Sequence, residues 1–267
     1  GTMKNRKKLL FCIVIFLFLI FSLLSYIVFQ KIIIKKNFED SYLPFADKNK
    51  NTVFTIDKIV MFSSADSKNK TSSATNFTIE NLYQYTDMAI FIKSTNNEHT
   101  LENTLKSVSI NNIKFDLPPS IGEPNLYFKS INTFAKSDVN DNNIITDNLD
   151  FNISSEDKAD LNTPTLFNNL ANPITLSYVN KNIKPDYTIT DTSSPITYDG
   201  SLLKKCNIDL SSINCNLSFD INITNNLDQN FKTTVFIGIP LQDNENIITN
   251  GNIKLTKDVN YKFYRYN

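Results

Sequence analysis

The side chains that could carry nucleophilic chemistry are few in this sequence. A thiolate paired with a histidine and assisted by an arginine could transfer acyl groups, because the histidine activates the thiol and the arginine stabilises the oxyanion. His99 is the only histidine, and Cys215 and Arg265 follow it in the chain. Any such catalytic centre therefore depends on whether the fold brings these three residues together.

The same three residues give the chain a superficial resemblance to sortases, which are membrane-anchored cysteine transpeptidases with these residue types in this order. The resemblance implies catalytic roles for His99, Cys215 and Arg265. The sequence departs from the family pattern, because Ser212-Ile-Asn214 precedes Cys215 where sortases have Thr-Leu-x-Thr, and Arg265 lies far beyond it. We therefore expect no catalytic residues, and a sortase-like enzyme of the cell envelope is the alternative.

Other motifs for catalysis or metal binding are incomplete. Ser201-Leu-Leu-Lys204 has the Ser-x-x-Lys spacing of penicillin-binding enzymes, but no Lys-Thr-Gly follows, and the local alternation predicts a strand where that family has a helix. Asp138, Asn140 and Asn142 alternate as calcium ligands do, but Asn143 stands in place of the turn glycine. The sequence contains no phosphate-binding loop, dinucleotide fingerprint or Cys-x-x-Cys. We expect neither a cofactor nor a bound metal.

The charge balance argues against nucleic acid as a partner. The chain has 27 Lys+Arg and 27 Asp+Glu, so its formal net charge is zero at pH 7. No excess of positive charge is present to attract a polyanion. The partner that the sequence does predict is a lipid bilayer.

Leu9–Phe29 is an apolar segment without a charged residue. At about 1.5 Å rise per residue, a helix of this length spans roughly 31 Å, the thickness of the hydrocarbon core. The segment exceeds the apolar core of a signal peptide, and Ser25-Tyr-Ile27 offers no small-x-small cleavage site, so we expect an uncleaved signal anchor. Four cations precede it within Lys4–Lys8 and three follow within Lys31–Lys36. This balance favours a cytoplasmic N-terminus and an extracytoplasmic body in a single-pass protein of the cell membrane.

The sequence divides into a tail, an anchor, a stalk and a body. We expect a cytoplasmic tail at 1–8, in which Gly1-Thr2 is a cloning remnant, the transmembrane anchor at 9–30, a juxtamembrane stalk at 31–51 and the ectodomain at 52–267. The ectodomain is long enough for one domain or for two. The acidic, Asn-rich stretch 137–160 is the candidate boundary between two subdomains.

Alternating apolar residues predict that the ectodomain is all-β. Ile213–Ile223 and Phe231–Leu241 each place apolar side chains on one face. Asp87–Lys93 is a short apolar run between polar ends, typical of a strand that is buried on both faces. Many short strands separated by turns predict an antiparallel β-sandwich, as one or two immunoglobulin-like sandwiches with one or two short helices.

Local spacing predicts further elements of the ectodomain. They are a strand with Phe54, Ile56, Lys58, Val60 and Phe62 on one face, a polar loop over 63–75, a hairpin at Asn111-Asn112, a helix through Tyr127, Ile131, Phe134 and Ala135, a short helix from Thr163-Pro164 to Asn172-Pro173, a hairpin at Asn250-Gly251 and a last strand over 261–266.

Cys206 and Cys215 each belong to an alternating apolar run and are expected to point into the core. A two-residue turn at Ser211-Ser212 would pair the two runs as a hairpin. The cysteines would then be diagonal neighbours about 7–8 Å apart, beyond the range of about 4.4–6.8 Å that a disulfide requires. We expect core thiols, and a disulfide would need another register or two strands that are not adjacent.

Two stretches, Asn172–Asn180 (NPITLSYVN) and Gly200–Lys204, resemble those of small single-pass membrane proteins of low-GC Gram-positive bacteria. The resemblance covers much of the ectodomain and implies no particular activity. Because no catalytic group is complete, we expect a membrane-anchored, extracellular binding or structural module. Its partner would be a protein or a glycan, in addition to the bilayer around Leu9–Phe29.

Overall fold

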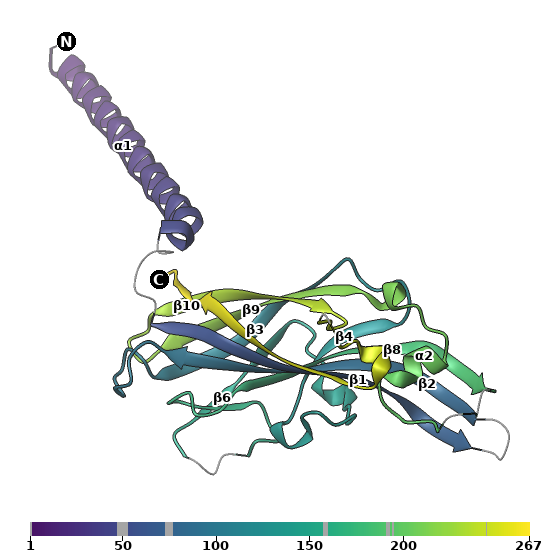
Figure 1. The fold of residues 1–267 in the computed structure, drawn as a ribbon. Coiled ribbons are helices and arrows are strands. Elements are labelled where there is room, and N and C mark those ends of the chain that lie inside the picture. The colour runs from purple at the N-terminus through teal and green to yellow at the C-terminus, as the bar shows by residue number, and fades with distance from the viewer. Residues whose placement is uncertain are drawn as a thin grey trace. The chain divides into compact units, whose positions relative to one another are not determined.

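The computed structural model describes residues 2–46, 53–72, 77–156, 160–190, 193, 195–243 and 245–267. The chain divides into two compact units, an N-terminal helix and a β-rich unit that spans residues 51–265 (Figure 1). The predicted combination of an apolar N-terminal helix and an all-β body is confirmed.

The N-terminal helix, α1, runs from Thr2 to Ala46. Within it, Asn5–Ile33 forms an apolar stretch of 29 residues with a mean hydropathy of 2.9. This stretch is long and apolar enough to cross a membrane, as predicted for Leu9–Phe29. The stalk predicted at 31–51 is helical as far as Ala46, and its last residues lie outside the described part of the chain.

Two five-stranded antiparallel sheets form the β-rich unit. Sheet A has the order β11-β1-β2-β8-β4, with β1 at Phe54–Ser72, β2 at Phe77–Ser94, β4 at Glu123–Phe128, β8 at Ile174–Ile189 and β11 at Ile253–Lys262. Sheet B has the order β12-β10-β9-β3-β5, with β3 at Leu105–Asp116, β5 at Asn148–Asp150, β9 at Cys215–Asn225, β10 at Asn230–Ile239 and β12 at Tyr264–Arg265. A small parallel pair consists of β6 at Asn152–Ser154 and β7 at Thr165–Phe167.

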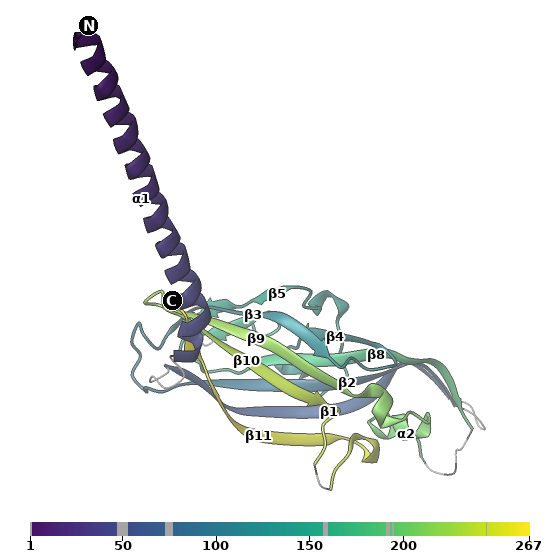
Figure 2. The same cartoon turned by 90° about the horizontal axis from the view of Figure 1, so that it is seen from above.

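The two sheets pack face to face as a β-sandwich. Phe54 of β1 meets Phe231 of β10 edge to face, with ring centroids 5.3 Å apart. Phe115 of β3 and Tyr178 of β8 meet at 6.0 Å. One cluster of buried apolar side chains therefore contains residues from both sheets. Figure 2 shows β11, β1 and β2 following one another in sheet A. The same view shows β10, β9 and β3 following one another in sheet B.

The face pattern predicted for β1 holds only for its first residues. Phe54 and Ile56 are buried, but the pairing with both neighbouring strands shifts between Ile56 and Lys58. Such a bulge adds one residue and exchanges the two faces of the strand that follows. As a result Ile59 and Met61 enter the core, and the predicted inward positions after the bulge face the other way.

The loop predicted over 63–75 is wrong, because β1 continues through these polar residues to Ser72. It pairs with β2 as far as Ser72 opposite Phe77, and residues 73–76 lie outside the described part of the chain. The ladder satisfies the backbone, and the Ser63 and Thr86 hydroxyls form a buried hydrogen bond of 2.6 Å. Pairing with a long partner strand thus overrides the polar composition.

The hairpin predicted at Asn111-Asn112 is also wrong, although Asn112 has the expected positive φ of 52°. Both halves of β3 pair with the same strand, with Asn111 opposite Asp220 and Lys114 opposite Ser218. Asn112 therefore forms a bulge within one strand. A left-handed residue can serve in a bulge as well as in a hairpin turn.

Both predicted helices between 124 and 173 are wrong. Tyr127 lies in β4, which pairs with β8, and Ile131–Thr133 is only a turn of 3₁₀ helix. The segment expected to begin a helix at Thr163-Pro164 instead contains β7. The first segment pairs with the edge of β8 and the second pairs with β6. In each case the hydrogen bonds to a neighbouring strand decide the local structure.

The strands of the last hundred residues are confirmed for β8, β9 and β10, but two turns differ. Residues 201–205 form a short helix, α2, so Ser201-Leu-Leu-Lys204 is helical and the predicted strand and hairpin at Cys206 do not form. Asn250-Gly251 ends a 3₁₀ turn, and β11 pairs with β1 instead of forming a hairpin. The last strand ends at Arg265 and is split into β11 and β12.

The stretch 137–160, the candidate domain boundary, belongs to the same compact unit as the rest of the body. It supplies β5 and β6 and the buried side chains Ile145 and Phe151 to the common core.

Candidate functional site

The fold does not gather the three residues of the sortase-like alternative. Cys215 begins β9 opposite Ile239, whereas Arg265 lies opposite Phe231, which pairs with Ile223. At about 3.3 Å per residue, Cys215 and Ile223 are roughly 26 Å apart along the strand. Cys215 and Arg265 therefore lie toward opposite ends of sheet B.

His99 lies apart from Cys215 as well. It is exposed in the connection between β2 and β3 and lines a pocket of about 430 Å³ that does not include Cys215. Cys215 is 2% exposed and lines a different pocket of about 410 Å³. Burial raises the pKa of the Cys215 thiol, which opposes formation of a thiolate nucleophile.

Cys206 and Cys215 are free and buried, as predicted for core thiols. Cys206 follows α2 instead of lying on a strand, so the hairpin register that argued against a disulfide does not exist. Burial raises the pKa of Cys206 to about 11, and the nearby Lys184 ammonium opposes this only in part. Both thiols therefore behave as small apolar core groups.

The predicted calcium-like spacing corresponds to a helix cap in the structure. Asn140 Oδ1 accepts a hydrogen bond of 3.0 Å from the backbone N–H of Asn142 at the start of a 3₁₀ turn. In the described part of the chain no three His, Cys, Asp or Glu side chains gather where they could hold a metal ion.

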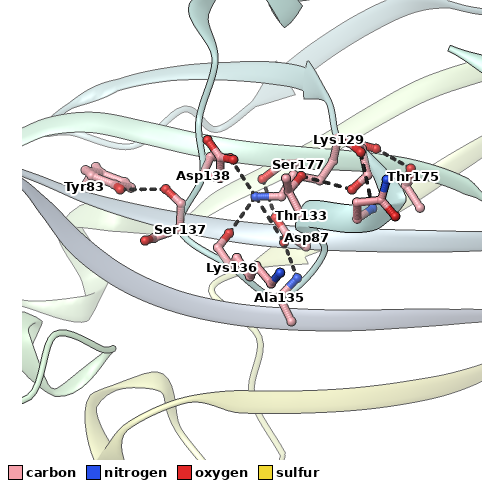
Figure 3. A network of polar contacts seen from close by, with 12 residues as sticks. Tyr83, Asp87, Lys129, Thr133, Ala135, Lys136, Ser137, Asp138, Thr175 and Ser177 are labelled. Carbon is pink, nitrogen blue, oxygen red and sulfur yellow. Dashed lines mark hydrogen bonds and ion pairs between the residues drawn. The ribbon is translucent and has the colours of Figure 1, made fainter. Parts of the chain in front are cut away.

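The most unusual polar group of the body is the Asp87 carboxylate on β2, whose side chain is 0% exposed. Asp87 faces away from sheet B and is paired in the strand ladder with Ser177 of β8. The Ser177 hydroxyl donates a hydrogen bond of 2.6 Å to Asp87 Oδ1, and the backbone N–H of Ala135 donates one of 2.9 Å to Oδ2. Figure 3 shows these donors around the carboxylate.

Lys129, directly after β4, is the cation beside Asp87. Its side chain is 3% exposed, and Nζ lies 3.4 Å from Asp87 Oδ2. Nζ also donates hydrogen bonds of 2.7 Å to the carbonyl of Lys136 and 2.9 Å to that of Asp138 (Figure 3). The Tyr85 ring lies 5.4 Å away, measured from Nζ to the ring centroid. The ammonium is thus enclosed by a carboxylate, two carbonyls and an aromatic face.

Residues 130–145, which we call the covering segment, lie over this pair. Val139 and Ile144 pack against the buried cluster of Tyr85, Tyr127 and Val179 on the outer face of sheet A. The Tyr83 hydroxyl donates a hydrogen bond of 2.9 Å to the carbonyl of Ser137. Ala135 has a φ of 61°, which a residue with a Cβ rarely adopts. Its N–H bond to Asp87 helps to hold this conformation.

Burial disfavours charge on both members of the pair. It raises the pKa of Asp87 to about 6, although Lys129 and the hydrogen-bond donors act in the opposite direction. It also lowers the pKa of Lys129, an effect that the Asp87 charge opposes. Each group is therefore closer to its neutral form than it would be in water.

A pocket of about 190 Å³ lies between the covering segment and sheet A. Tyr127, Ser177 and Val179 contribute to its lining from the strands, and Lys129 borders it from the end of β4. The remaining lining is mostly amide and hydroxyl, with one carboxylate and two apolar side chains, from Ser130, Thr133, Asn140, Asn143, Asn162, Asp138, Phe128 and Val139. The pocket is thus concave, polar and placed beside a pair with perturbed pKa values, which together mark a candidate binding site.

This site was not predicted from the sequence. In the sequence, Asp87 is only the polar end of a predicted apolar strand, and Lys129 lies within a segment that is predicted to be helical. The one sequence signal at Asp87 is a carboxylate directly before the apolar run Met88–Ile92, and its burial within residues 84–90 is seen only in the structure. No local signal shows that Lys129 is its partner.

The chain matches no protein-family model, and it shows no significant similarity to a curated protein or to a solved structure. The geometry of the pocket is therefore the feature from which a function can be inferred.

Proposed function

We propose that the protein is a membrane-anchored binding module and that the pocket beneath the covering segment receives a small, hydroxyl-rich group such as one sugar unit of an envelope glycan. The observation that carries this proposal is the lining of the pocket. Its volume of about 190 Å³ is small beside the range of roughly 300–1,000 Å³ typical of drug-sized ligands. A single sugar-sized group matches it better than a folded protein partner does.

The chemistry of the lining supports a neutral polar ligand. The Asn143 and Asn162 amides and the Thr133 hydroxyl can each donate and accept hydrogen bonds, as a sugar hydroxyl also can. Val139, which lines the pocket and is only partly buried, offers apolar surface to the less polar face of a sugar ring. Lys129 and Asp87 already neutralise each other, and the Asp138 carboxylate that also lines the pocket can accept hydrogen bonds from sugar hydroxyls.

The test is binding of the full chain, in detergent micelles, to a panel of neutral oligosaccharides of hexoses and N-acetylhexosamines, measured by calorimetry. Asn143→Ala removes an amide whose side chain lines the pocket, so it should weaken binding roughly 2- to 10-fold. Asn97→Ala is the matched control, because Asn97 lines a separate pocket near His99. Absence of binding to every member of the panel, or equal effects of both variants, would contradict the proposal.

The orientation in the membrane is part of the same proposal. A cytoplasmic N-terminus follows from the cations between Lys4 and Lys8, which resist translocation. The β-rich unit would then face the envelope, where glycans are present. Protease added to intact protoplasts should degrade the β-rich unit, whereas protection of that unit would show the opposite orientation.

No observation favours an enzyme as a second function. Cys215 lies away from both His99 and Arg265, and its thiol is buried.

A further inference from the structure

We propose that Lys129 Nζ and the Asp87 carboxyl group condense to an amide, so that the mature protein contains an intramolecular cross-link between the end of β4 and β2. The geometry brings this about, because the two side chains are 3% and 0% exposed and Nζ lies 3.4 Å from Oδ2. This inference is independent of ligand binding.

Proximity lowers the entropic part of the barrier to amide formation between a lysine and an aspartate. Well-placed reacting atoms lie about 3–3.5 Å apart, and holding them there replaces an encounter in solution by a step within one molecule. Nζ lies 3.4 Å from Oδ2, which is only one bond away from Cγ, the carbon that Nζ would attack. The carbonyls of Lys136 and Asp138 accept hydrogen bonds from Nζ and fix its position beside the carboxyl group. The covering segment encloses both reactive groups, so neither side chain can turn away into solvent.

The surroundings favour the protonation states that the step needs. A neutral amine attacks a protonated carboxyl group far better than an ammonium attacks a carboxylate. Burial raises the pKa of Asp87 to about 6 and lowers that of Lys129, so a proton moves from Nζ to the carboxyl more easily than in water. The two shifts together narrow the gap in pKa that separates the ion pair from the neutral pair.

Two donors are in place for the charge that develops on the carboxyl oxygens. Attack of Nζ on Cγ places negative charge on oxygen, and Ser177 Oγ–H and the Ala135 N–H already donate to Oδ1 and Oδ2. Because the Ser177 hydroxyl donates to Oδ1, it can pass a proton to that oxygen. Ser177 also lines the pocket, which gives the departing water a way out.

The step balances without another reactant. The Nζ–Cγ bond forms and one Cγ–O bond breaks. Of the three hydrogens on the Lys129 ammonium, one stays on the amide nitrogen and two leave with the carboxylate oxygen as water. The paired positive and negative charges disappear together, which removes the cost of keeping two ions away from water.

The cross-link would give this body the covalent constraint that its cysteines do not supply. Cys206 and Cys215 are free in the structure. A bond between Lys129 and Asp87 would join strands that are separated by β8 in sheet A and would restrict the unfolded chain, as a disulfide does. Such a constraint suits a module exposed outside the cell.

The test is the intact mass of the purified full chain, followed by tandem mass spectrometry of its proteolytic peptides. We expect a mass lower than that of the sequence by one water, together with a branched peptide in which Lys129 is joined to Asp87. An intact mass equal to that of the sequence overturns the proposal. A water loss without the branched peptide also overturns it, because the loss then lies elsewhere.

Two variants serve as controls. Lys129→Arg keeps the charge beside Asp87 but removes the reactive amine, so its mass should equal that of its sequence. Ser177→Ala removes the donor to Oδ1 and should slow cross-linking at least several-fold, which is measurable as an unlinked fraction soon after synthesis. A wild-type mass equal to that of Lys129→Arg, corrected for the substitution, would contradict the cross-link.

Discussion

Phe54 of β1 and Phe231 of β10 meet edge to face across the sandwich, with their ring centroids 5.3 Å apart. They are 0% and 2% exposed, and they tie sheet A to sheet B near the start of the body. This contact involves residues that are far apart in sequence, and it is typical of how the core of this protein is assembled.

Phe231→Ala should lower the free energy of unfolding by about 3–5 kcal/mol, because it leaves a cavity between the sheets and removes the aromatic contact. The measurement is denaturant unfolding of the full chain in micelles. Phe236→Ala is the matched control, since Phe236 is on the same strand but 65% exposed. Its effect should be within about 0.5 kcal/mol of zero, and equal effects of the two changes would contradict the sandwich packing.

The backbone at Ala135 provides a second prediction. Ala135 has a φ of 61° and an exposed side chain, so replacing it tests the backbone conformation alone. Ala135→Gly should raise stability by up to about 1 kcal/mol, because glycine adopts this region without the cost of roughly 1–2 kcal/mol that a Cβ incurs. Ala135→Val should lower stability, since a branched side chain is poorly tolerated there. Unfolding curves in which valine is tolerated as well as glycine would refute the left-handed conformation.

The Asp87 carboxyl group gives a pH dependence that can be seen where the cross-link is blocked, in Lys129→Arg. Arginine keeps the positive charge, and burial still raises the pKa of Asp87 above its ordinary value. The folded protein then holds a proton that the unfolded chain has already released. The contribution of Asp87 to stability is therefore fully present below the unfolded pKa and is lost as the pH rises through the folded one.

For this variant we expect the free energy of unfolding to fall between about pH 4 and about pH 6, relative to the double variant Lys129→Arg, Asp87→Asn, which has no carboxyl group to titrate. Parallel curves for the two proteins would show that Asp87 is not perturbed.

The two buried cysteines should behave as core residues. A thiol reagent added to the folded chain should leave Cys206 and Cys215 unmodified and should label both after denaturation, as read by peptide mass mapping. Cys215→Ser should lower stability by about 1–3 kcal/mol if the hydroxyl is left without a partner in the core. Rapid labelling of Cys215 in the folded protein would contradict the buried position and would revive the transpeptidase alternative.

Several local signals in the sequence correspond to real backbone features that the fold uses in a different way. Asn112 does adopt a positive φ, yet it forms a bulge in β3 instead of a hairpin turn. The apolar alternation that begins at Phe54 is real, yet the bulge after Ile56 exchanges its faces. A local pattern indicates which backbone conformations are accessible, but the partner strand decides how each is used.

Most of the candidate site lay beyond what the sequence could predict. Asp87 and Ser177 become neighbours only because β2 pairs with β8, and Lys129 joins them only because β4 pairs with the other edge of β8. The covering segment has no periodic pattern that would indicate where it lies. Its position depends on a few contacts with sheet A, among them the bonds from Ala135 to Asp87 and from Tyr83 to Ser137.

The sequence by itself determined two properties of this protein. The uncharged segment Leu9–Phe29 makes a helix able to cross a membrane, because length and hydrophobicity alone meet that requirement. The alternating residues of β9 and β10 make an all-β body, because a period of two suits only a strand with one buried face. The tertiary structure alone decided that a carboxylate and an ammonium would be buried in contact, because their meeting depends on long-range strand pairing and on the burial of both charges together.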